Sequence, residues 1–220
     1  MRRLSWLRRM AAVASLGDEK RRQLFELVAA SALPVGREDA ALALGLPRST
    51  ASFHLDRLVE DGLLAVEFHK PSGKSGPGSG RPAKMYRTAA AEVGASVPDR
   101  NYDLAGELMA TAIEHAAASG SPVGDSLLAM SYRKGQELAT GCESLEDFLA
   151  EEGYRPEPDG RGGVILANCP FHRLADGHPE VVCAMNGAFL GGAAAGCGDS
   201  RERVVKNNVP GQCCARITAP

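Results

Sequence analysis

The chain has 220 residues, 44% of them apolar, with 25 Lys and Arg against 27 Asp and Glu. No stretch approaches the ~18 uncharged apolar residues that a membrane helix requires, and no apolar signal core follows the basic start, so we expect a cytoplasmic protein without membrane contact. Residues 1–90 contain 15 basic and 9 acidic residues, whereas residues 91–220 contain 10 and 18. This asymmetry suits a DNA-binding module joined to a sensor or assembly module.

The first 17 residues are interpreted as a mobile basic tail, and residues 18–32 as the first helix, with Asp18 as its N-cap. The run 36–58 then predicts two short helices joined by a tight turn. Gly45 can adopt the left-handed backbone that ends a helix, and Pro47 suits the first turn of the next one. The order of these elements is typical of a helix-turn-helix, although a pair of ordinary packed helices would show the same pattern.

The second helix of this run carries polar side chains that fall largely off its apolar stripe and crowd its start. In a helix-turn-helix such residues meet base edges in the major groove. The candidate DNA-binding residues on this helix are Arg48, Ser49, Thr50, Ser52, His54 and Arg57.

After this helix, residues 64–68 alternate apolar and polar side chains, which predicts a strand. A loop rich in Gly, Ser and Pro follows over 71–82, and residues 85–87 can return as the partner strand. The loop region contains no acidic residue between Glu67 and Glu92, and its cations suit contact with phosphate or the minor groove. The candidates here are Lys74, Arg81 and Lys84. Helix, turn, helix and hairpin in this order resemble a winged helix of the ArsR-like bacterial regulators.

Residues 88–100 are interpreted as a hinge, and residues 101–119 as a long helix. Its apolar positions Leu104, Leu108, Ala112 and Ile113 repeat at helical spacing. This stripe could pack on the second domain, but we favour its burial between two copies of the chain, because such regulators are commonly dimers.

The rest of the chain predicts helices at 126–140 and 144–152, a strand at 164–167, a helix at 179–195 and two last strands, which together form a small α+β domain. The predicted layout is a tail at 1–17, a winged helix-turn-helix at 18–90, a helical dimerisation region at 99–142 and a cysteine-containing α+β sensor domain at 143–220. The fold class is therefore mainly α with α+β.

All six cysteines lie after residue 141. Without an export signal, metal or redox chemistry is favoured over a disulfide framework. Cys169 follows a strand, and Cys183 lies in the first two turns of a helix, where the positive helix end favours a thiolate. Cys197 lies 14 positions further along the same predicted helix, roughly 20 Å away. It is therefore a poor co-ligand unless the Gly191-Gly192 pair breaks the helix.

Cys213 and Cys214 are neighbours on a predicted strand and should point to opposite faces. Cys213 shares its face with apolar Ala215 and Ile217, so we choose it as the third ligand. Three thiolates suit zinc or an iron–sulfur cluster, for which His172, Asp176, His178 or a small molecule could be the fourth ligand. The alternative is that these cysteines are small buried hydrophobic residues.

The order of winged helix, long helix, Asn-Cys-Pro-Phe-His at 168–172, Pro-Glu-Val-Val-Cys at 179–183 and Pro-Gly-Gln-Cys-Cys at 210–214 resembles the SufR-type iron–sulfur regulators, which repress the Suf cluster-assembly operon. The resemblance covers about residues 18–218. It implies a homodimeric repressor with a [4Fe-4S] or [2Fe-2S] cluster on Cys169, Cys183 and Cys213, with His172 as a possible fourth ligand.

Two other functions remain open at this point. A zinc-, heme- or thiol-redox-responsive regulator would use the same cysteines, and Cys169-Pro170 matches the short Cys-Pro pattern of heme sensors. A cysteine-dependent enzyme would use Cys169 as nucleophile with His172 or His178 as base. No oxyanion loop or substrate pocket can be recognised, so we predict that the chain is not an enzyme.

Overall fold

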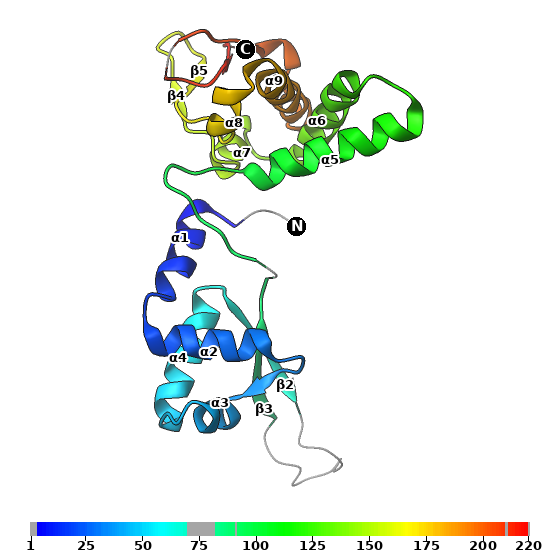
Figure 1. Cartoon of the computed structure of the whole chain (residues 1–220). Coiled ribbons are helices and arrows are strands. Elements are labelled where there is room, and N and C mark those ends of the chain that lie inside the picture. The colour runs from blue at the N-terminus through cyan, green and yellow to red at the C-terminus, as the bar shows by residue number, and fades with distance from the viewer. Residues whose placement is uncertain (1–3, 70–81, 91, 210, 220) are drawn as a thin grey trace. The chain divides into compact units, whose positions relative to one another are not determined.

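The computed structural model describes residues 4–69, 82–90, 92–209 and 211–219. The protein combines helices with two small antiparallel sheets, as expected for a mixed fold (Figure 1). It divides into two compact units, one formed by residues 5–95 and the other beginning at Ser96 and running to the C-terminal end. Each unit has its own hydrophobic core.

The described residues of the first unit form four helices, and the sequence explains where one of them begins. The Asp18 side chain accepts a hydrogen bond from the Arg21 amide and caps the second helix, as predicted. The expected mobile tail was wrong for its described part, because residues 6–15 form a helix whose Ala12 is fully buried. The helices are α1 (Trp6–Ser15), α2 (Glu19–Ala30), α3 (Arg37–Ala43) and α4 (Arg48–Glu60).

A three-stranded antiparallel sheet completes this unit. Its strands are β1 (Val35–Gly36), β2 (Leu64–His69) and β3 (Ala83–Thr88), in the spatial order β1-β3-β2. The register pairs Val66 with Tyr86, and Tyr86 is fully buried. The predicted hairpin is therefore present, while its loop at 70–81 lies outside the described residues.

In the second unit, the part that the structure describes forms five α-helices: α5 (Tyr102–Ser119), α6 (Val123–Ala139), α7 (Leu145–Glu151), α8 (His172–Gly177) and α9 (Pro179–Gly196). Leu104, Leu108 and Ala112 of α5 are buried in the core of this same unit, where α5 packs on α6. The prediction that they lie between two subunits was therefore wrong. Ile113 alone of that stripe is 59% exposed.

A four-stranded antiparallel sheet in the order β4-β5-β7-β6 lies in the second unit. Its strands are β4 (Pro156–Pro158), β5 (Val164–Leu166), β6 (Val204–Lys206) and β7 (Ala215–Ile217), with the short 3-10 helix η1 (Arg201–Arg203) before β6. The predicted division between 99–142 and 143–220 is not a boundary between compact units, because both segments belong to this one.

Helices α6 and α9 approach each other through glycines. A Cβ added at Gly192 would overlap the carbonyl oxygen of Tyr132, and one at Gly135 would overlap that of Phe189. The two backbones are therefore in direct contact, which only residues without a side chain allow. No helix within the described ranges is both long and apolar enough to cross a lipid bilayer.

Candidate functional site

In the first unit, α3 and α4 are joined by a turn in which Gly45 has a φ of 63°, the left-handed conformation that the sequence predicted. Arg48 and Ser49 are exposed in the first turn of α4. The Arg48 guanidinium lies 2.6 Å from the Glu38 carboxylate of α3. This ion pair occupies Arg48 in the free protein, so an approaching phosphate or base would compete with Glu38 for it.

The other predicted DNA-binding residues of α4 differ in how far their side chains are exposed. Arg57 is exposed, whereas Thr50 and Ser52 are half-buried. His54 is only 9% exposed, and its Nδ1 lies 3.9 Å from an Asp18 oxygen, so its predicted position on the groove face was wrong. Phe53 is 66% exposed on the same helix and was not predicted as part of this face. The spacing of apolar residues on α4 did not predict this exposure. It shows only that Phe53 lies beside the buried stripe.

At the hairpin, Lys84 forms an ion pair with Asp56 of α4, and Tyr86 donates a hydrogen bond of 2.8 Å to the same carboxylate. Burial opposes ionisation of Asp56, but the hydrogen bonds from Lys84 and Tyr86 outweigh it and lower the pKa of this carboxyl. Lys84 thus braces the hairpin against α4. Lys74 and Arg81, the other predicted wing residues, lie outside the described residues.

Four thiols gather in the second unit. They are supplied by the loop after β5 (Cys169), the second turn of α9 (Cys183) and the segment before β7 (Cys213 and Cys214). Hydrogen bonds link Cys169 to Cys213, Cys213 to Cys214 and Cys214 to Cys183. The three predicted ligands therefore belong to one group of sulfurs, which we call the thiol group, and Cys214 is its fourth member.

Asn186 lies beside the thiol group, three residues after Cys183 on the same helix. Its amide nitrogen is 3.2 Å from the Cys213 sulfur and 3.7 Å from the Cys214 sulfur. Its amide oxygen accepts a hydrogen bond from the Tyr154 hydroxyl, and both residues are buried. Because Tyr154 fixes the orientation of the amide, Asn186 presents N–H donors to the two sulfurs. The i, i+3 spacing from Cys183 was the signal that could have identified it.

The protonation of the thiols differs within the group. The hydrogen bond from Cys213 lowers the pKa of Cys169, although burial opposes it. Burial and the hydrogen bond with Cys214 raise the pKa of Cys183 to about 12, so the expected thiolate at the start of α9 was wrong for the metal-free chain. The hydrogen bond with Cys169 raises the pKa of Cys213 to about 12. Cys169 is therefore the thiol that ionises first.

The expected alternation of Cys213 and Cys214 was also wrong. The chain bends at Cys214, and β7 begins only at Ala215. Asn207 accounts for the bend: its backbone amide donates to the Cys214 carbonyl, and its side-chain amide to the Cys213 carbonyl. Both sulfurs consequently face Asn186.

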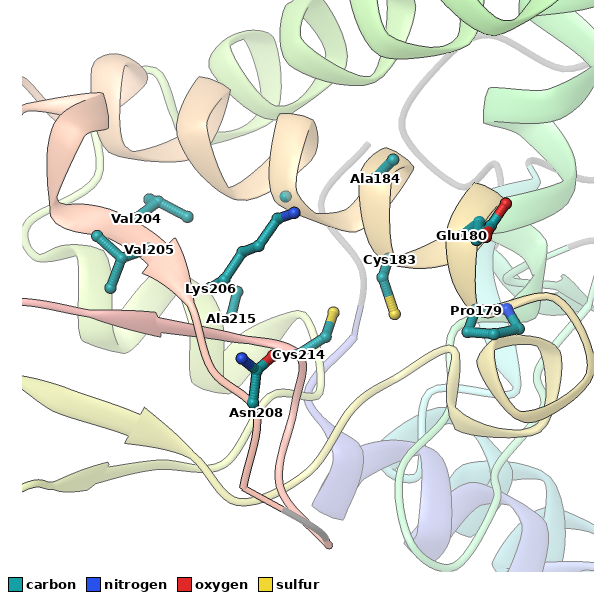
Figure 2. Close-up of a pocket in the computed structure, with 11 residues that line it drawn as sticks. Pro179, Glu180, Cys183, Ala184, Val204, Val205, Lys206, Asn208, Cys214 and Ala215 are labelled. Atoms are coloured by element: carbon teal, nitrogen blue, oxygen red, sulfur yellow. The ribbon is translucent and has the colours of Figure 1, made fainter.

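A pocket of about 630 Å³ opens onto the Cys183 and Cys214 side of the thiol group (Figure 2). Lys206 and Asn208 also line this pocket. In the described part of the chain, no three His, Cys, Asp or Glu side chains are arranged around a point where one metal ion would bind. The three side chains considered as a possible fourth ligand are all exposed: His172 begins α8, Asp176 lies near its end and His178 follows it.

The loop that holds Cys169 is bound to the segment 99–101, just after the boundary between the units. The Asn168 side-chain amide donates to the carbonyls of Asp99 (2.9 Å) and Gly153 (2.6 Å), and Arg100 donates to the Asn168 amide oxygen. The Asn101 backbone amide donates to the Pro170 carbonyl. Asn168 was part of the sequence motif, but its partners were not predicted.

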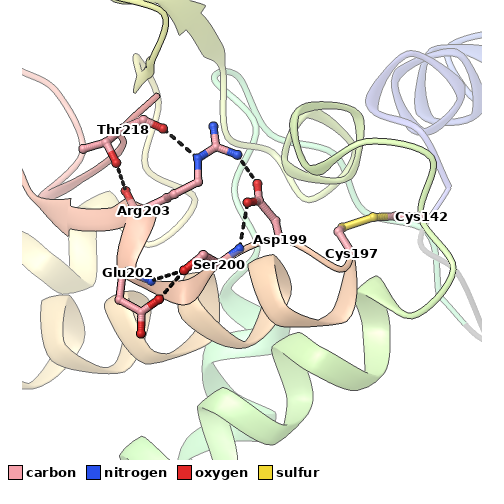
Figure 3. A network of polar contacts seen from close by, with 7 residues as sticks. All are labelled: Cys142, Cys197, Asp199, Ser200, Glu202, Arg203 and Thr218. Carbon is pink, nitrogen blue, oxygen red and sulfur yellow. Dashed lines mark hydrogen bonds and ion pairs between the residues drawn. A yellow bond between two sulfur atoms is a disulfide. The ribbon is translucent and has the colours of Figure 1, made fainter. Parts of the chain in front are cut away.

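Cys142 and Cys197 form a disulfide between the segment after α6 and the end of α9 (Figure 3). The expectation that disulfides are disfavoured was therefore wrong for this pair. Helix α9 is continuous from Pro179 to Gly196, as the argument against Cys197 as a co-ligand required. Beyond the disulfide, Arg203 is paired with Asp199 and donates to the Thr218 carbonyl, which joins the end of α9 to β7.

Comparison with known proteins adds no assignment: no family model, curated protein or solved structure matches this chain.

Proposed function

We propose that the chain is a DNA-binding transcriptional regulator, a repressor of the winged-helix type, whose operator affinity is controlled by an iron–sulfur cluster. It acts in the cytoplasm as a homodimer, and it is not an enzyme. The observation that supports this proposal best is the set of hydrogen bonds between the Cys169 loop and residues 99–101. These bonds join the thiol group to the segment through which the chain enters from the helix-turn-helix unit.

The side chains at the thiol group fit an iron–sulfur cluster in their chemistry. Cys169, Cys183 and Cys213 would hold it, since thiolates are the usual ligands of such clusters. When bound, the cluster supplies a redox-active group that forms only where iron and sulfide are available. A single zinc ion would have to draw its ligands around one centre, whereas each iron of a [4Fe-4S] cluster needs only one cysteine. The chain of paired thiols favours the second arrangement.

The residues of the chain provide the coupling. Cys169, Cys183 and Cys213 come from three separate elements, so ligation would restrain all three at once. Because Asn168 and Pro170 are hydrogen-bonded to residues 99–101, restraining the Cys169 loop would also restrain these residues. Helix α5 begins directly after them, at Tyr102. Ligation affects DNA binding only if it favours one arrangement of the two units over another. The homodimer must use residues other than Leu104, Leu108 and Ala112, which are buried within the chain.

The test is to purify the full chain without oxygen and to measure its absorbance, iron and sulfide. Duplex DNA selected from a random pool by this protein then serves as the probe. A coupling of about 1–3 kcal/mol predicts that loaded and metal-free forms differ roughly 5- to 150-fold in affinity. Equal affinities would disprove sensing, and failure to select any sequence would disprove operator binding. A colourless zinc protein or a sharp Soret band would indicate the zinc or heme alternative instead.

A further inference from the structure

One amide group contacts two adjacent thiols in the second unit. Asn186 Nδ2 lies 3.2 Å from Cys213 Sγ and 3.7 Å from Cys214 Sγ. Since consecutive side chains of an extended strand point to opposite faces, this contact depends on the bend that Asn207 stabilises. The sulfurs of Cys213 and Cys214 therefore both lie beside Asn186, whereas in a regular strand only one of them would.

Cys214 is also the residue that connects Cys183 to the other sulfurs. Cys183 is hydrogen-bonded to Cys214, whereas Cys169 is hydrogen-bonded to Cys213. Figure 2 shows the Cys183 side chain extending from α9 toward the side of the pocket where Cys214 lies. The two half-buried sulfurs, Cys183 and Cys214, border the pocket, while Cys213 is only 1% exposed.

We propose that Cys214 is a fourth thiolate ligand of the iron–sulfur cluster, beside Cys169, Cys183 and Cys213. This inference rests on the proposed function. Four cysteines are the ordinary ligand set of a [4Fe-4S] cluster, and this set needs neither His172 nor a small molecule. His172 is exposed on α8, whereas Cys214 already contacts Cys183 and Asn186. The pocket beside Cys183 and Cys214 is then the side from which the cluster is reached by solvent.

The test reconstitutes the full chain with ferrous iron and sulfide under anaerobic conditions. Wild type is compared with Cys214→Ala, with His172→Ala and with a Cys142→Ala/Cys197→Ala control. The expected result for Cys214→Ala is loss of the chromophore, or retention of about three irons per chain in place of four. His172→Ala and the double variant should keep the wild-type absorbance and iron content. An unchanged cluster in Cys214→Ala, or loss of an iron in His172→Ala, would overturn the assignment.

A second measurement on wild type does not depend on whether the variants fold. Iodoacetamide is added to the loaded and metal-free chains, and each cysteine is quantified by mass spectrometry. The reaction time is chosen so that Cys183, which is mostly protonated, is alkylated in the metal-free chain. Ligation by Cys214 then predicts that Cys214 is protected in the loaded chain and alkylated, as Cys183 is, once iron is removed. Alkylation of Cys214 in the loaded chain, with Cys183 protected, would contradict the proposal. If wild type gains no chromophore at all, the proposed function itself fails, and this outcome is distinct from a three-cysteine cluster.

Discussion

Helix α9 carries cysteines at both ends, and the two ends differ. At its start, Cys183 joins three thiols from a loop and a bend, beside a pocket. Just after its end, Cys197 is bonded to Cys142 where α6 and α9 touch backbone to backbone. About 20 Å of helix separates them. The two ends differ in what the local packing brings together. Backbone contact between α6 and α9 accompanies the Cys142–Cys197 bridge, whereas hydrogen bonds from Asn168 and Asn207 hold the loop and the bend that present free sulfurs.

The largest effect is expected from removing the backbone contact between α6 and α9, which lies toward the Cys197 end of α9. Gly192→Ala places a Cβ against the Tyr132 carbonyl, so α6 and α9 must separate. We expect the free energy of unfolding to fall by about 3 kcal/mol or more. Urea titration measures it. Gly187→Ala on the same helix is the matched control, because no atom lies within 4 Å of its added Cβ, and it should be neutral or stabilising. Equal stability of the two variants would contradict backbone contact.

The bridged end can be tested by itself. Cys142→Ala/Cys197→Ala removes a disulfide with a sequence separation of 55 residues, which should lower the stability of the oxidised chain by about 2–4 kcal/mol. In a thiol reductant the wild type should become equally unstable. Urea titrations with and without reductant measure both effects. If iron content also falls in this variant, the two ends of α9 are not independent.

The thiol end predicts unequal reactivity in the metal-free chain. The pKa of Cys169 lies below its ordinary value and that of Cys183 is raised to about 12, so Cys169 carries more thiolate near neutral pH. We expect iodoacetamide to modify Cys169 about tenfold faster or more, even though a less basic thiolate is a weaker nucleophile. The rate at Cys169 should rise through a lower pH range than the rate at Cys183. Mass spectrometry of samples quenched between about pH 6 and about pH 10 measures the alkylation rates of the two cysteines. Faster modification of Cys183 would reverse the assignment.

The smallest effect is expected from removing the hydrogen bonds that connect the Cys169 loop to residues 99–101. Asn168→Ala removes the hydrogen bonds to Asp99, Gly153 and Arg100 but no sulfur. We expect unchanged iron content and a reduction of the affinity difference between loaded and metal-free forms by about 0.5–2 kcal/mol. DNA titration of both forms measures it. Asn208→Ala, on the pocket wall, is a control that should leave this difference intact.

Local chemistry in the sequence was sufficient to predict most elements. Asp18 caps α2 and Gly45 follows α3, both as expected, and the helix predicted from residue 101 begins at Tyr102 with Asn101 as its cap. Periodicity on α5 identified a buried face, but it could not identify what covers that face, since a second helix of the same chain and a second copy bury apolar side chains equally well.

The thiol group, too, could be predicted only in part, because local sequence patterns do not show which distant segments meet. Cys169, Cys183 and Cys213 were placed together by motif, and the structure brings them together with Cys214. The Cys142–Cys197 bond and the bend held by Asn207 depend on contacts between distant segments or on local backbone turns, neither of which has a periodic signal. Burial of His54 likewise depends on how α4 is rotated against its neighbours.

The hydrogen bonds of residues 99–101 have a practical meaning for modular engineering. Asp99, Arg100 and Asn101 belong, by their contacts, to the cysteine-containing half. A chimaeric protein that grafts this half onto a foreign DNA-binding module should therefore retain the native chain from Ser96 onward. Joining at Tyr102, where α5 begins, would discard the hydrogen bonds of residues 99–101 to the Cys169 loop, on which the proposed coupling depends.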